Sequence, residues 1–264
     1  MARAPVALTI AGSDSGGGAG IQADLKTFSA LGAYGASVLT AITAQNTLGV
    51  TGVFELPTDI IAAQIDAVVT DIRPDVVKTG MIASIDIIST VAERLRHYQL
   101  RQLVVDPVMV AKSGDALLGP DAVAALREQL LPLALVATPN LPEAETILGR
   151  KIESLDAMHA AARELVRECG ARAVVVKGGH LAGPPIDVFF DGSELRELAA
   201  ERVDTKNTHG TGCTFASAIA AYLAGGEPLP EAVRKAKSYL TEALRRAFDV
   251  GGGHGPVHHF WKWW

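Results

Sequence analysis

A glycine-rich turn at residues 207–214, NTHGTGCT, carries one of the two cysteines of the chain. Small and apolar residues continue to Ala224 and predict a buried helix that begins near Gly210. The amino end of a helix favours negative charge, and Gly210 and Gly212 leave its backbone N–H groups open to an anion. The same position lowers the pKa of a thiol, so Cys213 is expected to react near neutral pH as a nucleophile or a base. An inert buried cysteine is the alternative, and the preceding H-G-T-G sequence favours the reactive one.

A second glycine-rich loop, AGSDSGGGAGIQAD, covers residues 11–24 and has five glycines between positions 12 and 20. Its G-x-G-x-x-A pattern at 18–23 is that of a dinucleotide site, but no acid for the ribose occurs between Asp24 and Glu55. The chain also lacks a G-x-x-x-x-G-K-[ST] phosphate loop. We therefore expect this loop to bring backbone close to a small ligand, with a tight strand-to-helix turn as the alternative.

Asp24 lies on the flank of an apolar helical stripe formed by Ile21, Leu25 and Phe28. A carboxylate in that place needs a partner, because the burial of an unpaired charge is costly. The alternative is an acid that stabilises the helix start through the helix dipole. The residue pattern leaves both roles open.

Short β-branched runs alternate with longer helical patterns along the chain. The runs lie at residues 6–11, 37–43, 75–80, 102–108, 134–140 and 172–179. This alternation predicts an α/β fold with a mostly parallel central sheet and helices on both faces. Pro57 opens one helix, Ser154 caps another that ends at Gly170, and an Asp-Gly turn predicts a β-hairpin over 186–203. No linker or repeat interrupts the pattern, so residues 1–264 are expected to form one domain.

The residues with chemical potential follow the predicted strands. In an open α/β sheet the ligand lies at the carboxyl ends of the strands, so these residues should meet at one rim. In chain order they are Gly12 to Gly20, Gln45, Met81, Asp106, Lys112, Asn140, Glu143 and Lys177.

The composition is that of a globular protein without a strongly charged surface. The 264 residues are 48% hydrophobic, and 29 acids against 24 bases give a formal net charge of −5. Lys and Arg form no basic stripe, so neither a nucleic acid nor a membrane is an expected partner. The first apolar run is too short for a signal peptide, and no stretch is apolar enough to span a bilayer. Cys169 and Cys213 give no disulfide framework, and we expect a cytoplasmic location.

Eight segments together resemble one family of kinases. The segments are AGSDSGGGAGIQADLKTF (11–28), TAQNT (43–47), VKTGM (77–81), VVDPVMVAKSG (104–114), TPNLPEAE (138–145), VVKGGH (175–180), DTKNTHGTGCTFASAIAA (204–221) and GHGPVHHFW (253–261). Over nearly the whole chain the sequence is similar to the hydroxymethylpyrimidine/phosphomethylpyrimidine kinases of thiamine biosynthesis, within the ribokinase-like superfamily. The resemblance implies a three-layer α/β/α sandwich. It also implies an ATP-dependent kinase that converts 4-amino-5-hydroxymethyl-2-methylpyrimidine to the monophosphate and then to the diphosphate.

The resemblance implies a role for each matching residue. Ribokinase-like enzymes usually carry an aspartate base at the end of the glycine turn, and Cys213 would take its place. The backbone amides of Gly210 to Cys213 would stabilise charge on the transferred group. Asp106 and Glu143 would organise Mg²⁺, although a strand-end cap and a helix-start acid are their ordinary alternatives.

The remaining implied contacts fall into two groups. The nucleotide group consists of Lys177, which would lie along the phosphates during transfer, and Lys112, Asn140 and Thr205. The pyrimidine group consists of Gln45, Asp24, Gly12, Ala19, Met81 and Val108. An amide both donates and accepts hydrogen bonds, which suits the edge of an aminopyrimidine. His209 is a candidate to contact the substrate phosphate in the second step.

Two other functions stay open from the sequence. Pyridoxal kinase is the nearest rival, because pyridoxal and hydroxymethylpyrimidine both present a hydroxymethyl group beside a flat nitrogen heterocycle. A non-catalytic sensor of a thiamine precursor is the other, although base, metal and phosphate groups together favour an enzyme. The resemblance further implies a homodimer. The tail HGPVHHFWKWW (254–264) is expected to pack on the domain, since the adjacent His258 and His259 would not face one metal ion.

Overall fold

The computed structural model describes residues 3–109, 119–179, 181 and 183–264. One sheet contains nine strands in the order β3-β2-β1-β4-β5-β6-β7-β8-β9. The pairings from β2 across to β7 are parallel, whereas β3, β8 and β9 pair antiparallel at the two ends. The strands are β1 (Val6–Asp14), β2 (Tyr34–Gln45), β3 (Val50–Glu55), β4 (Val76–Thr79), β5 (Leu103–Val105), β6 (Val136–Ala137), β7 (Val174–Val176), β8 (Ile186–Phe190) and β9 (Leu195–Ala199).

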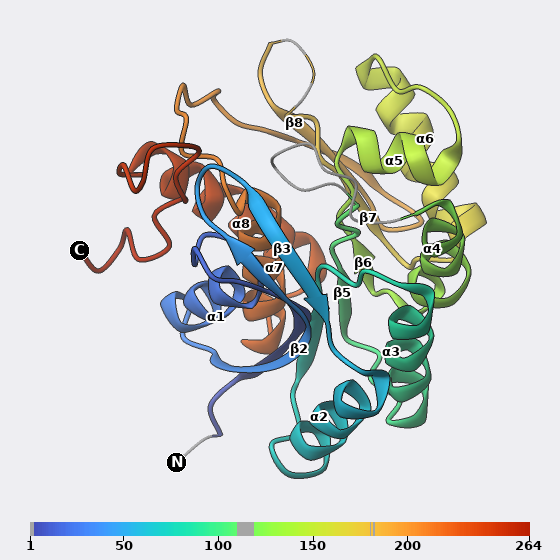
Figure 1. The fold of residues 1–264 in the computed structure, drawn as a ribbon. Coiled ribbons are helices and arrows are strands. Elements are labelled where there is room, and N and C mark those ends of the chain that lie inside the picture. The colour runs from blue at the N-terminus through green and yellow to red at the C-terminus, as the bar shows by residue number, and fades with distance from the viewer. Residues whose placement is uncertain (1–2, 110–118, 180, 182) are drawn as a thin grey trace.

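Helices cover both faces of this sheet (Figure 1). One hydrophobic cluster joins the sheet to α1, α7 and α8, and the other joins it to α2, α3, α4, α5 and α6. The helices are α1 (Gly20–Ala30), α2 (Thr58–Asp71), α3 (Ile85–His97), α4 (Pro120–Ala125), α5 (Leu141–Leu148), α6 (Leu155–Cys169), α7 (Thr211–Ala224) and α8 (Leu229–Arg245). This arrangement confirms the predicted three-layer α/β/α fold. Within the described part of the chain, no helix has the length and apolar character needed to cross a membrane.

The central strands send alternate side chains into the two clusters. In β7, Val174 and Val176 pack with the α2 to α6 side, and Val175 packs with the α1, α7 and α8 side. Because both faces are covered, such strands read in the sequence as continuous apolar runs. The small residues of α7 allow that helix to be buried from Thr214 to Ala221.

The capping and turn residues in the sequence predicted the bounds of several elements correctly. The Ser154 side chain accepts from Ala157 N at the start of α6, and Gly170 ends that helix with a φ of 74°. The predicted hairpin is confirmed as β8 and β9. The edge strand β3 was not predicted, because every residue of it after Val50 is exposed and it therefore shows no apolar alternation.

Candidate active site

A cavity of about 390 Å³ opens at the carboxyl ends of the central strands. A volume of this size suits a small ligand. The parallel strands bring together at one rim residues from the whole length of the chain. The predicted residues that line the cavity are Gly12, Ala19, Gln45, Met81, Asp106, Val108, Asn140, Glu143, Lys177, His209, Gly210, Gly212 and Cys213.

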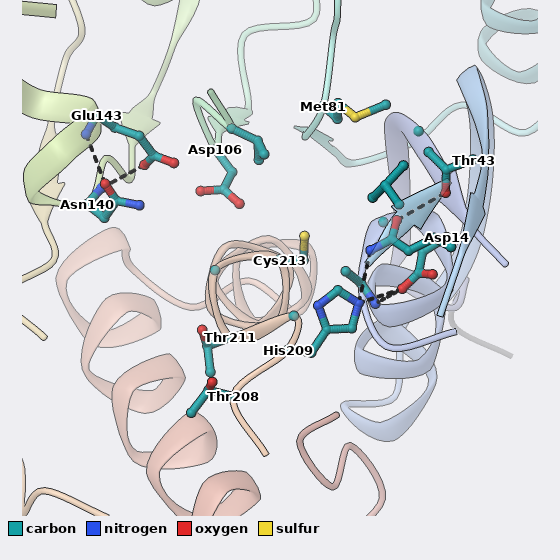
Figure 2. Close-up of a pocket in the computed structure, with 18 of the residues that line it drawn as sticks. Asp14, Thr43, Met81, Asp106, Asn140, Glu143, Thr208, His209, Thr211 and Cys213 are labelled. Carbon is teal, nitrogen blue, oxygen red and sulfur yellow. Dashed lines mark hydrogen bonds and ion pairs between the residues drawn. The ribbon is translucent and has the colours of Figure 1, made fainter. Parts of the chain in front are cut away.

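Cys213 stands at the amino end of α7 between two groups of side chains (Figure 2). Asp106, Glu143 and Asn140 lie on one side of it. Asp14, His209, Thr43 and Met81 lie on the other side. A ligand that fills the cavity would therefore contact the thiol near its middle. One end of the ligand would meet the carboxylates, and the other would meet the glycine loop and β2.

Asp106 follows β5 and is buried. Its Oδ1 accepts from Lys177 Nζ at 3.0 Å and from Thr138 Oγ1 at 3.2 Å. Its Oδ2 is buried and has no hydrogen-bond partner among the described residues. Because an unpaired buried oxygen is costly, Oδ2 is available to a cation or a proton donor in the cavity.

Lys177 remains charged in this setting. Burial lowers the pKa of its ammonium group, but the carboxylates of Asp106 and Glu143 outweigh burial and hold that pKa above its ordinary value. The end of β7 therefore presents a fixed positive charge to the cavity.

Glu143 and Asn140 form a capping box at the start of α5. Asn140 N donates to Glu143 Oε2 at 2.7 Å, and Glu143 N donates to Asn140 Oδ1 at 2.9 Å. Burial, opposed by the charge of Lys177 and assisted by that of Asp106, raises the pKa of Glu143 to about 7. The Glu143 carboxyl therefore titrates near neutral pH when no cation is bound.

The two carboxylates fit a magnesium ion. In the described ranges, no three His, Cys, Asp or Glu side chains stand close enough to hold a metal as a group. Mg²⁺ does not need such a group, because it usually keeps several waters and binds one or two carboxylates together with phosphates. The unpartnered Oδ2 of Asp106 and the neighbouring Glu143 are oxygen donors of this kind.

Cys213 is half-buried on the first turn of α7. The expected low pKa of its thiol is wrong. Burial raises the pKa of Cys213 to about 12, the charge of Lys78 and the N–H of Gly20 lower it, and Asp24 and Asp106 raise it. A helix N-terminus stabilises a thiolate, but desolvation outweighs that effect here. Without ligands the thiol is therefore protonated at neutral pH.

Asp14 organises the opposite wall. Its Oδ2 accepts from Gly18 N at 3.0 Å and from Ala19 N at 2.8 Å, and its Oδ1 accepts from Gly16 N at 2.8 Å. His209 Nε2 lies 2.8 Å from the same Oδ2. Burial raises the pKa of Asp14, but the hydrogen bonds from His209 and the loop amides outweigh burial and hold that pKa below its ordinary value. Asp14 is thus a fixed negative charge that orients the loop and the imidazole.

Gln45 ends β2 beside His209. Its Nε2 lies 3.3 Å from His209 Nε2, and its Oε1 accepts from Thr43 Oγ1 at 3.0 Å. Met81 contributes an apolar side chain to the same end of the cavity, and a Cβ on Gly12 would lie 2.6 Å from Met81 Cε. An amide beside a flexible apolar side chain suits a flat heterocycle with a polar edge.

The two glycine-rich segments touch each other. Gly210 has a φ of 77°, and a Cβ there would lie 1.8 Å from Gly18 O, so only glycine fits. A Cβ on Gly212 would lie 3.4 Å from both Asp106 Oδ2 and Lys177 Nζ. The bare backbone at the start of α7 therefore faces the charged end of the cavity.

The C-terminal segment braces both walls. Gly255 O accepts from His209 N at 3.0 Å, and Thr47 O accepts from His254 N at 3.0 Å. A Cβ on Gly253 would lie 2.0 Å from Thr47 O. The segment therefore holds the loop after β2 and the turn before α7 at a fixed separation.

The aromatic tail packs on the domain in part. Trp261 lies against Tyr239 with ring centroids 6.1 Å apart, whereas Trp263 and Trp264 are 68% and 71% exposed. Burial lowers the pKa of His259 to about 3, so this imidazole is neutral at physiological pH. The expected packing is confirmed: besides the Trp261 contact, Trp263 Nε1 donates to Ala30 O at 3.3 Å, and the Trp264 ring lies 5.5 Å from that of Phe248.

Three predicted contacts need correction or stay open. Asp24 does not line the cavity; it is fully buried and forms an ion pair with Lys78 at 2.9 Å, so its predicted contact with a ligand is wrong. Thr205 also lies outside the lining residues, and its hydroxyl accepts from Asn207 N at 3.1 Å. Lys112 lies outside the described residues.

Asp14 and Lys78 are functional candidates that the residue pattern did not single out. Asp14 gave a usable signal, since it is an acid at the start of a five-glycine loop. Lys78 gave none, because it stands in the apolar run DVVKTG and its partner Asp24 is 54 positions away.

Comparison with known proteins agrees with this geometry. Residues 14–258 match the phosphomethylpyrimidine kinase family. A hydroxymethylpyrimidine/phosphomethylpyrimidine kinase of Rhizobium meliloti is 59% identical over 262 residues, with 98% of each chain covered. A relative of the same name from Escherichia coli is 51% identical, again with 98% of each chain covered. Among solved structures, a Bacillus subtilis pyridoxal kinase in complex with ADP matches with a TM-score of 0.91 at 43% identity, covering 97% of this chain and 98% of that one.

The matches extend across the sheet, both glycine-rich segments and the cavity. The chain therefore belongs to the phosphomethylpyrimidine kinase family.

Proposed function

We propose that this protein is the hydroxymethylpyrimidine/phosphomethylpyrimidine kinase of a thiamine biosynthesis pathway. It transfers the γ-phosphate of ATP to 4-amino-5-hydroxymethyl-2-methylpyrimidine and then phosphorylates the monophosphate to the diphosphate. The observation that carries the proposal is the place of Cys213 in the cavity, between a charged wall and a wall of amide and apolar groups. Relatives that bear this activity in their names, at 59% and 51% identity, support it.

The pyrimidine occupies the end of the cavity lined by Gln45, Met81 and Val108. The Gln45 amide pairs with a ring nitrogen and the exocyclic amine, since it can donate and accept at once. The two apolar side chains pack against the ring, and the backbone at Gly12 and Ala19 borders it. This placement directs the hydroxymethyl group towards Cys213.

ATP occupies the charged end. Lys177 binds the phosphates, and Asn140 borders the nucleotide. The N–H groups of Gly212 and Cys213 belong to the first turn of α7, where they have no intrahelical partner. They stabilise the negative charge that develops on the transferred group. The ADP complex of the Bacillus subtilis relative supports a nucleotide as a ligand of this fold.

Cys213 acts as the general base rather than as a covalent nucleophile. Its thiolate takes the proton of the hydroxymethyl group while that oxygen bonds to the γ-phosphorus and the bond to the ADP oxygen breaks. Phosphoryl transfer has a loose transition state, so the proton leaves late. Because the pKa of the free thiol is about 12, the reaction requires groups that stabilise the thiolate.

Asp106 and Glu143 would hold Mg²⁺ through their carboxylates. When bound, the ion neutralises charge on the phosphates. The raised pKa of Glu143 means that its carboxyl group must lose a proton before it binds a cation.

The second phosphorylation brings a phosphate into the pyrimidine end of the cavity. His209 lines that end and is held 2.8 Å from Asp14. It is the residue that we assign to contact the phosphate of the monophosphate.

One assay tests the proposed function. Purified protein is incubated with ATP, Mg²⁺ and either hydroxymethylpyrimidine or pyridoxal, and the products are followed over time by mass spectrometry. Sequential appearance of the pyrimidine monophosphate and diphosphate is the expected result. Pyridoxal phosphate as the dominant product would instead assign the protein to vitamin B6 salvage. The structural match to a Bacillus subtilis pyridoxal kinase is the observation that favours this alternative.

A second copy of the chain covers the β2–β3 ribbon. Ile42 and Phe54 stand directly opposite each other in the antiparallel register, and they are 47% and 65% exposed. Exposed apolar side chains that lie together mark a site of protein contact, and a two-fold dimer presents the same patch from both copies. The two cysteines are free, which suits a reducing compartment and supports a cytoplasmic location.

A further inference from the structure

A buried polar cluster lies beneath Cys213 and takes no part in the chemistry above. It consists of Thr9 on β1, Asp24 on α1, Lys78 on β4 and Ser217 on α7, and each of these residues is 0% exposed. Lysine is almost never fully buried unless it is paired. The complete burial of this ammonium group therefore requires a partner that stabilises its charge.

Asp24 holds the ammonium group in one place. Lys78 Nζ donates to Oδ1 and Oδ2 of Asp24 at 2.9 Å each. Thr9 Oγ1 donates to Oδ2 at 2.6 Å, and Ser217 Oγ donates to Oδ1 at 2.6 Å. Donors from three other elements thus fix the carboxylate, and the carboxylate fixes the lysine.

The cluster contacts α7 through Ser217 and lies next to Gly80, which leads into the cavity wall. Ser217 follows Cys213 by four residues, so both lie on the same face of that helix. A Cβ on Gly80 would lie 2.8 Å from Lys78 Nζ, and Gly80 directly precedes Met81 of the cavity wall. The ammonium group is therefore held under the first turns of α7, where the thiol stands.

We propose that Lys78 is a positioning residue whose buried ammonium group, held by Asp24, supplies the fixed positive charge that stabilises the thiolate of Cys213. The inference deepens the proposed function, and its effect on turnover rests on that function. The charged groups that act on the thiol are Lys78 on β4, Lys177 after β7, Asp24 on α1 and Asp106 after β5, together with the N–H of Gly20. Of the two cations, Lys78 has the larger effect on the thiol, and Lys177 is already paired with Asp106 at 3.0 Å.

Structural stabilisation alone does not account for the pair. Replacement of a buried ion pair by well-packed apolar residues is often neutral or stabilising, because desolvation offsets the attraction. Burial raises the pKa of the neighbouring thiol to about 12 even with Lys78 in place. Without this charge the pKa of the thiol would be higher still, and a smaller fraction of it would be thiolate.

The test measures the thiolate directly, without substrate. In a Cys169→Ala background, which leaves Cys213 as the single thiol, the rate of alkylation by iodoacetamide is measured at about pH 9 by intact-protein mass spectrometry. A neighbouring opposite charge shifts a pKa by about 1–3, so Lys78→Met is expected to slow alkylation about 10- to 1000-fold. Lys237→Met is the matched control, because it removes another lysine that is paired with a buried aspartate, Asp187 at 2.7 Å. The control should stay within about two-fold of the parent protein, since Lys237 does not face the thiol.

The direction in which the alkylation rate changes distinguishes an electrostatic role of Lys78 from a role in packing. A merely structural lysine would, when replaced, expose the thiol and speed its alkylation. A rate for Lys78→Met that equals or exceeds the parent rate would therefore overturn the proposal. If that variant does not fold, Lys78→Met with Asp24→Asn removes both charges. Asp24 acts on the thiol in the opposite sense to Lys78 and more weakly, so this double variant is also expected to react more slowly than the parent, but by a smaller factor. An unchanged or faster rate would refute the idea equally.

Turnover provides the second readout. Lys78→Met should lower kcat for pyrimidine phosphorylation by a similar factor while KM for ATP stays within about two-fold, because Lys78 does not line the nucleotide end. Slower alkylation in a protein that phosphorylates no pyrimidine would uphold the thiolate inference and reject the proposed function. Unchanged alkylation in a variant that still phosphorylates pyrimidine would reject the thiolate inference and uphold the proposed function.

Discussion

Glu143 gives the sharpest prediction, because its raised pKa links the stability of the ligand-free protein to pH. Burial lifts this pKa from 4.5 to about 7, and the residue is 6% exposed, so solvent screens the effect little. A shift of this size corresponds to about 3 kcal/mol. The folded protein binds the proton more tightly than the unfolded chain does. The Glu143 contribution to the free energy of unfolding is therefore fully present below about pH 4.5, falls as the pH rises to about 7, and is constant above that.

Glu143→Gln removes this pH dependence. Glutamine is neutral at every pH and retains an oxygen that can accept from Asn140 N in the capping box. Relative to the parent protein, the variant should gain about 3 kcal/mol in the free energy of unfolding between pH 4.5 and 8. Urea unfolding without Mg²⁺ and ATP, repeated across that range, measures the difference.

Glu145→Gln is the matched control on the same helix. Hydrogen bonds from Lys151 and from Ile152 N hold the pKa of Glu145 below its ordinary value, so its titration lies below this window. The difference between that variant and the parent should not change from pH 4.5 to 8. A flat difference for Glu143→Gln, or one that falls with pH, would refute the account of Glu143 as a carboxyl kept protonated by burial.

Three further predictions concern catalysis, the C-terminal brace and assembly. Cys213→Ala should lower turnover about 10²–10⁴-fold with ATP binding retained, and Cys213→Asp should recover part of it; near-normal steady-state turnover in the alanine variant would place the base elsewhere. Gly253→Ala puts a Cβ 2.0 Å from Thr47 O and should cost about 1–3 kcal/mol in urea unfolding, whereas Gly252→Ala, with its nearest atom at 3.9 Å, should be nearly neutral. Phe54→Asp should give a monomer by sedimentation, and a dimer that survives it would exclude the β2–β3 ribbon as the contact.

The ligand-binding rim was predictable because it follows from local patterns. Apolar periodicity located the parallel strands, and the carboxyl ends of such strands meet at one edge. Gln45, Asp106, Glu143 and Lys177 therefore came together as expected. The resemblance to the kinase family added their implied roles. The strand β3 was not predicted, since its residues are exposed and show no alternation of apolar and polar side chains.

The electrostatics of the site depend on contacts that only the tertiary structure makes. The sequence by itself determined that Cys213 begins a helix, which pointed to a low pKa, whereas the fold buries the thiol and raises that pKa to about 12. It left open whether Asp24 pairs with a charge or stabilises the helix start, and the fold pairs it with Lys78, 54 residues away in the chain. Asp14 and His209 are separated by 195 positions and lie 2.8 Å apart. Helix starts and strand ends are set by near neighbours in the chain, but desolvation and charge pairing depend on every group within a few ångströms, whatever its place in the sequence.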